Sequence, residues 1–103
     1  MLIYKFPLSV DFDKAEDIKM PAGATVLALQ VQRGVPCIWA TVEQDAPKIR
    51  RRFRTYGTGH PMEDADRFPY YVGTYQLPEL PSLVCHVFTD RIDRPISPFE
   101  GKR

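Results

Sequence analysis

A run of basic residues from Lys48 to Arg54 is the part of this sequence best suited to bind a charged partner. On a β-strand, Arg50, Arg52 and Arg54 would point to one face, with about 6.6 Å between successive side chains. Guanidinium groups at that spacing match a row of phosphates or carboxylates, which they bind through paired hydrogen bonds. Tyr56 ends the same face and offers a ring for stacking. These three arginines are named the arginine stripe.

A solvated strand face is the alternative interpretation of the arginine stripe. The chain has 14 Lys and Arg against 13 Asp and Glu, which gives a formal net charge of +1. Balanced charge argues against a protein that coats nucleic acid, and the acidic loops at 11–17 and 63–66 can neutralise the stripe. Arg51 points to the opposite face with Phe53, where we expect it to lie at a sheet edge or to pair with a carboxylate.

The compact turn Gly57-Thr58-Gly59-His60 follows the stripe and is a candidate anion site. The two glycines let backbone N–H groups approach a phosphate closely, and the imidazole lies beside them. The turn lacks the spacing of a P-loop and of a Rossmann fingerprint, so a purely structural turn is the competing interpretation. We expect a binding surface patch formed by Arg50, Arg52, Arg54, Tyr56, Gly57, Gly59 and His60. Within it, a concave site is expected where Arg50, Arg52, Arg54, Tyr56 and His60 converge.

Histidine and cysteine side chains give little support for catalysis or metal binding. Cys37, Cys85, His60 and His86 lack the local spacing of zinc ligands. Cys85 and His86 are neighbours on a predicted strand and point to opposite faces, so they cannot pair as nucleophile and base. We expect His86 to be half-buried against a backbone carbonyl. The sequence therefore predicts no catalytic residue, no metal and no cofactor, and a small hydrolase around both histidines is the enzyme alternative.

The elements that must position these residues are short β-strands, because 10 Pro and 6 Gly interrupt the chain. Hydrophobic alternation of period two predicts strands at 2–8, 17–20, 25–32, 37–43, 49–56, 70–76 and 83–90. Arg33-Gly34 fits a tight hairpin between the third and fourth strands. Both faces of the fourth strand are largely apolar, so we expect it to be central and covered on both sides, with Trp39 as a core anchor.

Six or seven strands with at most one short helix predict an all-β fold, a mainly antiparallel sandwich or small barrel. The length of 103 residues suits a single domain, which we assign to residues 1–90, followed by an extended C-terminal tail at 91–103. Two cysteines are too few for a disulfide framework, so we expect both to stay reduced. No apolar run approaches a membrane span, and the start lacks the features of a signal peptide.

Five sequence blocks in a fixed order carry a resemblance: IYKFPL, PAGATVLALQVQRGVPCIWATVE, FRTYGTGHP, YVGTYQ and CHVF. Together they resemble a family of small uncharacterised proteins from phages and prophages, over residues 2–89. The resemblance implies expression in the cytoplasm of a bacterial host. It brings no activity, cofactor or catalytic residue with it.

We expect a non-enzymatic binding protein with a host protein as its partner. In the context that the resemblance implies, this is a phage-encoded accessory protein, such as an anti-defence inhibitor of a host nuclease or CRISPR effector. Nucleic acid or a nucleotide is the alternative partner of the arginine stripe, which would make the chain a nucleotide-binding protein or sponge. A virion or structural component is a further alternative. The sequence does not define an oligomeric state.

Overall fold

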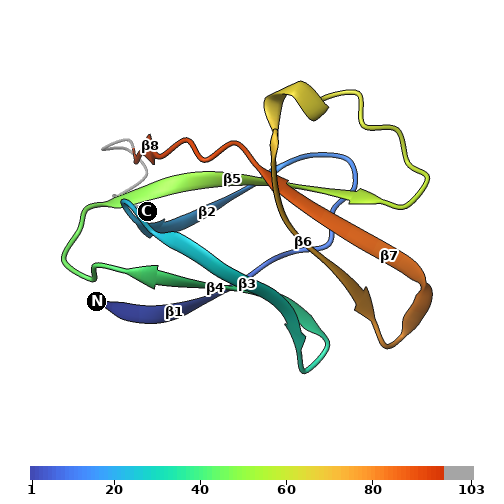
Figure 1. Ribbon diagram of the computed structural model, residues 1–103, viewed down its shortest axis with the longest axis horizontal. Coiled ribbons are helices and arrows are strands. Elements are labelled where there is room, and N and C mark those ends of the chain that lie inside the picture. The colour runs from blue at the N-terminus through green and yellow to red at the C-terminus, as the bar shows by residue number, and fades with distance from the viewer. Residues whose placement is uncertain (97–103) are drawn as a thin grey trace.

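The computed structural model describes residues 1–96, which form a sandwich of two antiparallel sheets (Figure 1). Sheet A has the order β1-β4-β3, and sheet B has the order β2-β5-β7-β6 with β8 beside β5. The strands of sheet A are β1 (Leu2–Pro7), β4 (Val35–Val42) and β3 (Thr25–Gln32). Those of sheet B are β2 (Glu16–Pro21), β5 (Lys48–Gly57), β7 (Leu80–Thr89), β6 (Tyr70–Leu77) and β8 (Arg94–Pro95).

The all-β prediction is confirmed. Eight strands are present, and the only helical segment among the described residues is a single 3-10 turn, η1 (Ala65–Arg67). The eighth strand, β8, lies in the segment expected to be a tail. None of the described residues belongs to a helix long and apolar enough to cross a membrane.

The core lies between the two sheets and follows strand alternation. Ile38, Ala40 and Val42 of β4 are fully buried and face Phe53 and Val87 of sheet B within one hydrophobic cluster. The hairpin between β3 and β4 forms at Arg33 and Gly34, whose φ angles of 53° and 79° suit a tight hairpin turn. The hairpin prediction is therefore confirmed.

The prediction for Trp39 is wrong. β4 is the central strand of sheet A, but its odd-numbered residues point away from the core because the even-numbered ones fill it. Trp39 is registered with Lys5 and Ala28 on that outward face and stays partly exposed. The outward face of β4 is thus only partly covered, and Trp39 does not anchor the core.

The sandwich is held together on one side by the edge strands β3 and β6. An added Cβ at Gly73 of β6 would lie 3.0 Å from the Cβ of Leu29 on β3, so the two backbones approach closely at this point. Each strand carries a bulge nearby, between Val26 and Ala28 in β3 and between Tyr71 and Gly73 in β6. Bulges bend and twist their strands, so the two edges change direction next to their closest approach.

A short interruption separates β7 from β8. β7 pairs with β5 from Phe53 to Gly57, and β8 pairs with Ile49 and Arg50 of the same strand. The connecting residues, named the 90–93 loop, leave the sheet through Arg91, whose φ of 59° lies in the left-handed region. Part of the expected tail is therefore incorporated into sheet B, and its remainder, 97–103, lies outside the described residues.

Candidate functional site

The three arginines of the stripe lie on the outward face of sheet B, as the alternation predicts. Arg52 is registered with Asp17 of β2, and the two side chains form a paired contact. Arg52 Nε donates to Asp17 Oδ1 at 2.7 Å, and a terminal nitrogen donates to Oδ2 at 3.1 Å. The Arg52 hydrogen bond lowers the pKa of Asp17, and the same contact raises the pKa of Arg52.

Arg54 and Tyr56 are buried beneath the segment 61–69 and fix it to the sheet. Arg54 Nε donates to Asp64 at 2.8 Å, and the Tyr56 hydroxyl donates to the other oxygen of Asp64 at 2.6 Å. Arg54 also donates to the backbone carbonyl of Phe12 at 2.8 Å. Tyr56 therefore offers no open ring face for a base. It serves instead as a support for the segment above it.

The pKa values around Asp64 follow from this arrangement. Burial, followed by the hydrogen bond to the Asp64 carboxylate, raises the pKa of Tyr56 far above its ordinary value. Burial alone would raise the pKa of Asp64, but hydrogen bonds from Tyr56 and Arg54 outweigh it and lower that pKa. Asp64 is thus a stable carboxylate and Tyr56 a stable neutral donor near neutral pH.

Arg50 lies farther along the same face and is partly exposed. Its register partners are Lys19 of β2 and Arg94 of β8, so three cations meet at this end of the sheet. The charges of Arg94 and Arg50 contribute to the lowered pKa of Asp17, after the dominant hydrogen bond from Arg52.

The glycine turn at 57–60 is shaped by close packing of its own histidine. A Cβ at Gly57 would lie 2.6 Å from Cε1 of His60, and Gly59 has a φ of 84°. The His60 backbone N–H donates to the Gly57 carbonyl at 3.0 Å, and its ring meets Phe12 edge-on at 5.1 Å. Both glycines thus have a structural role in this turn.

His86 contacts hydroxyl groups rather than the expected backbone carbonyl. Its Nε2 lies 2.7 Å from the Thr58 hydroxyl and its Nδ1 lies 2.9 Å from the Thr74 hydroxyl. This outcome follows from strand register, because His86 of β7 lies directly opposite Thr74 of β6. Residues 1–96 contain no group of three or more His, Cys, Asp or Glu side chains arranged to hold a metal ion.

Two grooves run along the outward side of sheet B. The first, named the outer groove, encloses about 890 Å³ and is lined by Lys14, Ala15, Asp17, Arg52, Asp64, Asp66, Arg67, Phe68, Pro69, Tyr70, Asp90, Ile92 and Arg94. The second has a similar volume and is lined by Phe12, Asp13, Arg54, His60, Pro61, Glu63, Asp64, Asp66 and Arg67.

The seven predicted patch residues do not share one concavity. Arg52 lines the outer groove, whereas Arg54 and His60 line the second groove. The remaining predicted residues line neither groove: Arg50, Tyr56, Gly57 and Gly59. The segment 61–69 separates the two grooves, because Asp64 at its centre is tied to Arg54 and Tyr56.

The outer groove combines charged and apolar side chains. Among residues 1–96, its lining holds four cations and four carboxylates: Lys14, Arg52, Arg67, Arg94, Asp17, Asp64, Asp66 and Asp90. Phe68 is buried beneath it, while Tyr70 and Ile92 remain exposed. Mixed charge around exposed apolar groups is typical of surfaces that bind proteins.

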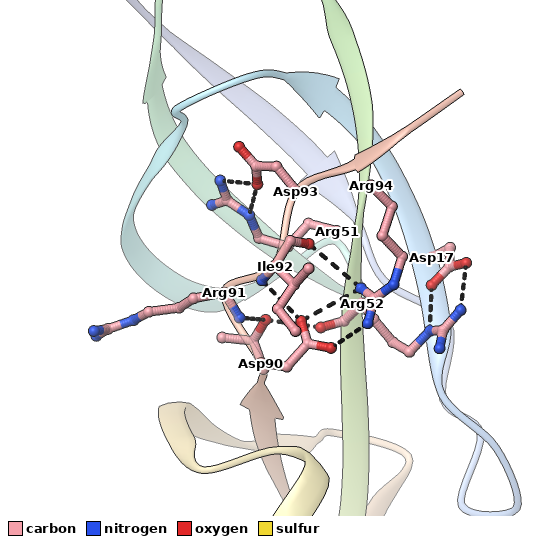
Figure 2. A network of polar contacts seen from close by, with 9 residues as sticks. Asp17, Arg51, Arg52, Asp90, Arg91, Ile92, Asp93 and Arg94 are labelled. Atoms are coloured by element: carbon pink, nitrogen blue, oxygen red, sulfur yellow. Dashed lines mark hydrogen bonds and ion pairs between the residues drawn. The ribbon is translucent and has the colours of Figure 1, made fainter. Parts of the chain in front are cut away.

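The 90–93 loop contributes Asp90 and Ile92 to one wall of the outer groove. Figure 2 shows the polar contacts within this loop. Asp90 accepts hydrogen bonds from Arg94 at 2.5 Å and from the Ile92 backbone N–H at 3.0 Å. Burial would raise the pKa of Asp90, but the hydrogen bonds from Arg94 and Ile92 lower it. These hydrogen bonds hold the backbone of the loop in place, and the Ile92 side chain is exposed.

Sequence reasoning missed most residues of this wall. The sequence places Asp90 at the end of the strand 83–90 and assigns Ile92 and Arg94 to the extended tail, which contains Pro95. The available signal was the alternation of Asp and Arg from Asp90 to Arg94, which places opposite charges close enough to pair. Asp17 lay in an acidic segment already expected to neutralise the stripe, and its pairing with Arg52 agrees with that alternative.

The fold and groove define a small antiparallel β-sandwich with a charge-balanced outer surface. The chain belongs to a family described as Domain of unknown function (DUF7352), whose model matches residues 1–96. The match includes β8 and so extends beyond the boundary at residue 89 expected from the sequence blocks. No curated protein and no solved structure matches the chain.

Proposed function

We propose that this protein is a binding module that docks a polypeptide segment of a host protein in the outer groove. The observation that carries the proposal is the equal number of cations and carboxylates in the described lining, around the exposed apolar side chains of Tyr70 and Ile92. A polypeptide carries both charge signs and apolar side chains, so it can complement all three features at once. The sequence resemblance supports the finer proposal of a phage-encoded inhibitor of a nuclease or CRISPR effector in the bacterial cytoplasm.

Nucleic acid fits this surface less well than a polypeptide. A row of phosphates needs cations that are free to bind it, and each such contact releases counterions. Arg52, Arg54 and Arg94 are already paired with Asp17, Asp64 and Asp90. Phosphates would have to displace these carboxylates or lie beside them, and both arrangements are unfavourable.

The test compares two exposed isoleucines in affinity capture from host lysate. Ile92→Asp places a charge in the outer groove, and Ile3→Asp places the same charge on β1, where the side chain is similarly exposed (53% and 60%). We expect the wild type and Ile3→Asp to retain the same host protein and Ile92→Asp to lose it. The captured protein is then purified, and its affinity for each variant is measured by calorimetry.

A decrease in affinity of tenfold or more for Ile92→Asp alone is expected, because central apolar contacts dominate such interfaces. Equal affinity of Ile92→Asp and wild type for the purified partner would exclude the outer groove as the docking surface. Folding of both variants is checked by their amide NMR spectra.

A nucleotide is the second candidate ligand. Lys14 and Arg67 line the outer groove, and within residues 1–96 the structure gives neither of them a carboxylate partner. Tyr70 adds an aromatic ring, although Arg91 already stacks on it at 4.0 Å. A nucleotide present at 100 times its Kd would stabilise the fold by about 2.7 kcal/mol. Thermal-shift measurements with a nucleotide panel decide between the two ligands.

A further inference from the structure

A separate cavity opens between the two sheets, on the opposite side of β5 from the outer groove. It encloses about 550 Å³ and is named the inter-sheet cavity. Its lining comes from the turn before β3, the start of β3 and the start of β6. One residue of β5, one residue of β7 and Arg91 complete it. This volume lies within the range of about 300–1,000 Å³ typical of small-molecule sites. Neither the arginine stripe nor the proposed docking surface includes it.

The cavity lies where both edge strands bulge. The bulge in β3 includes Leu27 and the bulge in β6 includes Val72, and both residues line the cavity. Farther along, Leu29 and Gly73 bring the same two strands into close contact. The pair of bulges thus opens a gap next to a closed contact. Bulges are frequently found beside binding and active sites.

Arg51 supplies a buried cation with unused hydrogen-bond donors. Its side chain is only 8% exposed, and it lines the cavity. Nε and one terminal nitrogen donate to Asp93 Oδ1 at 2.9 and 2.6 Å, and the other terminal nitrogen donates to the Ala24 carbonyl at 2.6 Å. A guanidinium has five N–H groups, so one N–H on each terminal nitrogen has no acceptor within residues 1–96.

The charge balance of the cavity favours a singly charged anion. The described lining includes two cations, Arg51 and Arg91, and no carboxylate. Asp93 neutralises Arg51 from outside the lining, whereas Arg91 stacks on the Tyr70 ring. Figure 2 shows Arg51 and Arg91 on one side of β5, with Arg52 and Arg94 on the other. Counting residues 1–96, the cavity side therefore keeps a formal net charge near +1.

We propose that the inter-sheet cavity binds a small organic monocarboxylate. The carboxylate accepts hydrogen bonds from the two remaining N–H groups of Arg51 and is attracted by Arg91. Its apolar body lies against Val26, Leu27 and Val72, three of the apolar side chains of the lining. A phosphate dianion matches this site less well, because one net positive charge does not balance two negative ones.

The test is an amide NMR titration of the full chain with sodium octanoate. We expect saturable shifts at Ala24, Leu27 and Val72, and no such saturable response with 1-octanol or inorganic phosphate. Arg91→Met removes the exposed charge but keeps an apolar stem, and we expect it to weaken octanoate binding about tenfold. Arg67→Glu, in the outer groove, is the control and should leave octanoate affinity unchanged.

Three outcomes overturn the proposal: no saturable shift with octanoate, equal shifts with 1-octanol, or octanoate shifts that centre on the outer groove. Arg51→Met is a second variant with the same expected loss of octanoate binding. If it does not fold, Arg91→Met still decides the question, because its side chain is exposed. Failure of octanoate binding leaves capture of a host protein by the outer groove unaffected, so the two proposals are tested independently.

Discussion

Arginine–aspartate ion pairs form on both sides of β5, but they differ in how exposed they are to solvent. Arg51 and Arg52 are consecutive, and each is paired with an aspartate, yet their side chains are 8% and 39% exposed. Arg51 lines the inter-sheet cavity with Asp93 outside the lining, whereas Arg52 and Asp17 both line the outer groove. The comparison teaches that strand parity assigns these two arginines to opposite sides of the sheet, and that the segments covering each side then decide how exposed the ion pair is.

The 90–93 loop joins these two regions. Its first residue, Asp90, faces the outer groove and binds Arg94, while its last, Asp93, binds Arg51 and also accepts the Gly23 backbone N–H at 3.0 Å. The left-handed conformation of Arg91 lets the loop place its two acidic side chains, Asp90 and Asp93, on opposite sides of the sheet. The loop therefore connects the cavity to the groove through a few backbone bonds.

The largest loss in the free energy of unfolding is expected when the Arg51–Asp93 pair on the cavity side is broken. Asp93→Ala leaves the buried Arg51 guanidinium without its counter-ion and removes the acceptor of the Gly23 N–H. We expect a loss of about 3 kcal/mol in the free energy of unfolding, measured by denaturant titration. Asp17→Ala is the matched control on the groove side, with an expected loss below about 1 kcal/mol. Equal losses for the two variants would contradict the difference drawn between the sides.

An intermediate loss in the free energy of unfolding is expected when the buried hydrogen bond between Tyr56 and Asp64 is removed. Tyr56→Phe removes the hydroxyl that donates to Asp64 at 2.6 Å but keeps the ring that contacts Phe88. Because this hydrogen bond involves a charged acceptor, the free energy of unfolding should fall by about 2 kcal/mol. Hydrogen exchange of the segment 61–69 should accelerate as well. Tyr71→Phe, which removes an exposed hydroxyl, serves as the control.

A small loss in the free energy of unfolding is expected when the exposed Arg52–Asp17 pair is broken. Arg52→Gln removes the paired contact with Asp17, and the loss in the free energy of unfolding should lie below about 1 kcal/mol. Salt should reduce this loss further, because both side chains reach solvent. Thermal denaturation at low and high salt measures both quantities. A loss as large as that of Asp93→Ala would mean that the outer pair is structural too.

The smallest of the expected effects concerns how the free energy of unfolding changes with pH. The pKa values of Asp17, Asp64 and Asp90 are lowered in the folded protein, so the folded state binds their protons less readily than the unfolded state. Their contribution to stability is therefore complete above the unfolded pKa of about 4 and is lost as the pH falls through the folded values. In Arg52→Gln the acid loss should be shallower, because Asp17 loses the main cause of its lowered pKa. An unchanged slope in acid titrations would show that Asp17 contributes nothing to it.

The strands could be predicted from the sequence because each carries its own pattern. Residues 25–32 and 37–43 are each rich in apolar and β-branched residues, and Arg33-Gly34 between them is a recognisable turn, so the sequence predicts this hairpin without tertiary information. Trp39 was misplaced because both faces of its strand are apolar. In such a strand, alternation shows which residues share a face but does not show which face meets the second sheet.

The sequence by itself determined an all-β chain with arginines alternating along one strand. Only the tertiary structure decided which arginines form ion pairs, because their partners lie in other segments of the chain. Asp17 comes from β2, Asp64 from the segment before β6, and Asp93 from the loop after β7. The groove and the inter-sheet cavity were likewise invisible in the sequence. Each depends on segments distant along the chain that meet only when the two sheets pack, and local periodicity carries no record of that meeting.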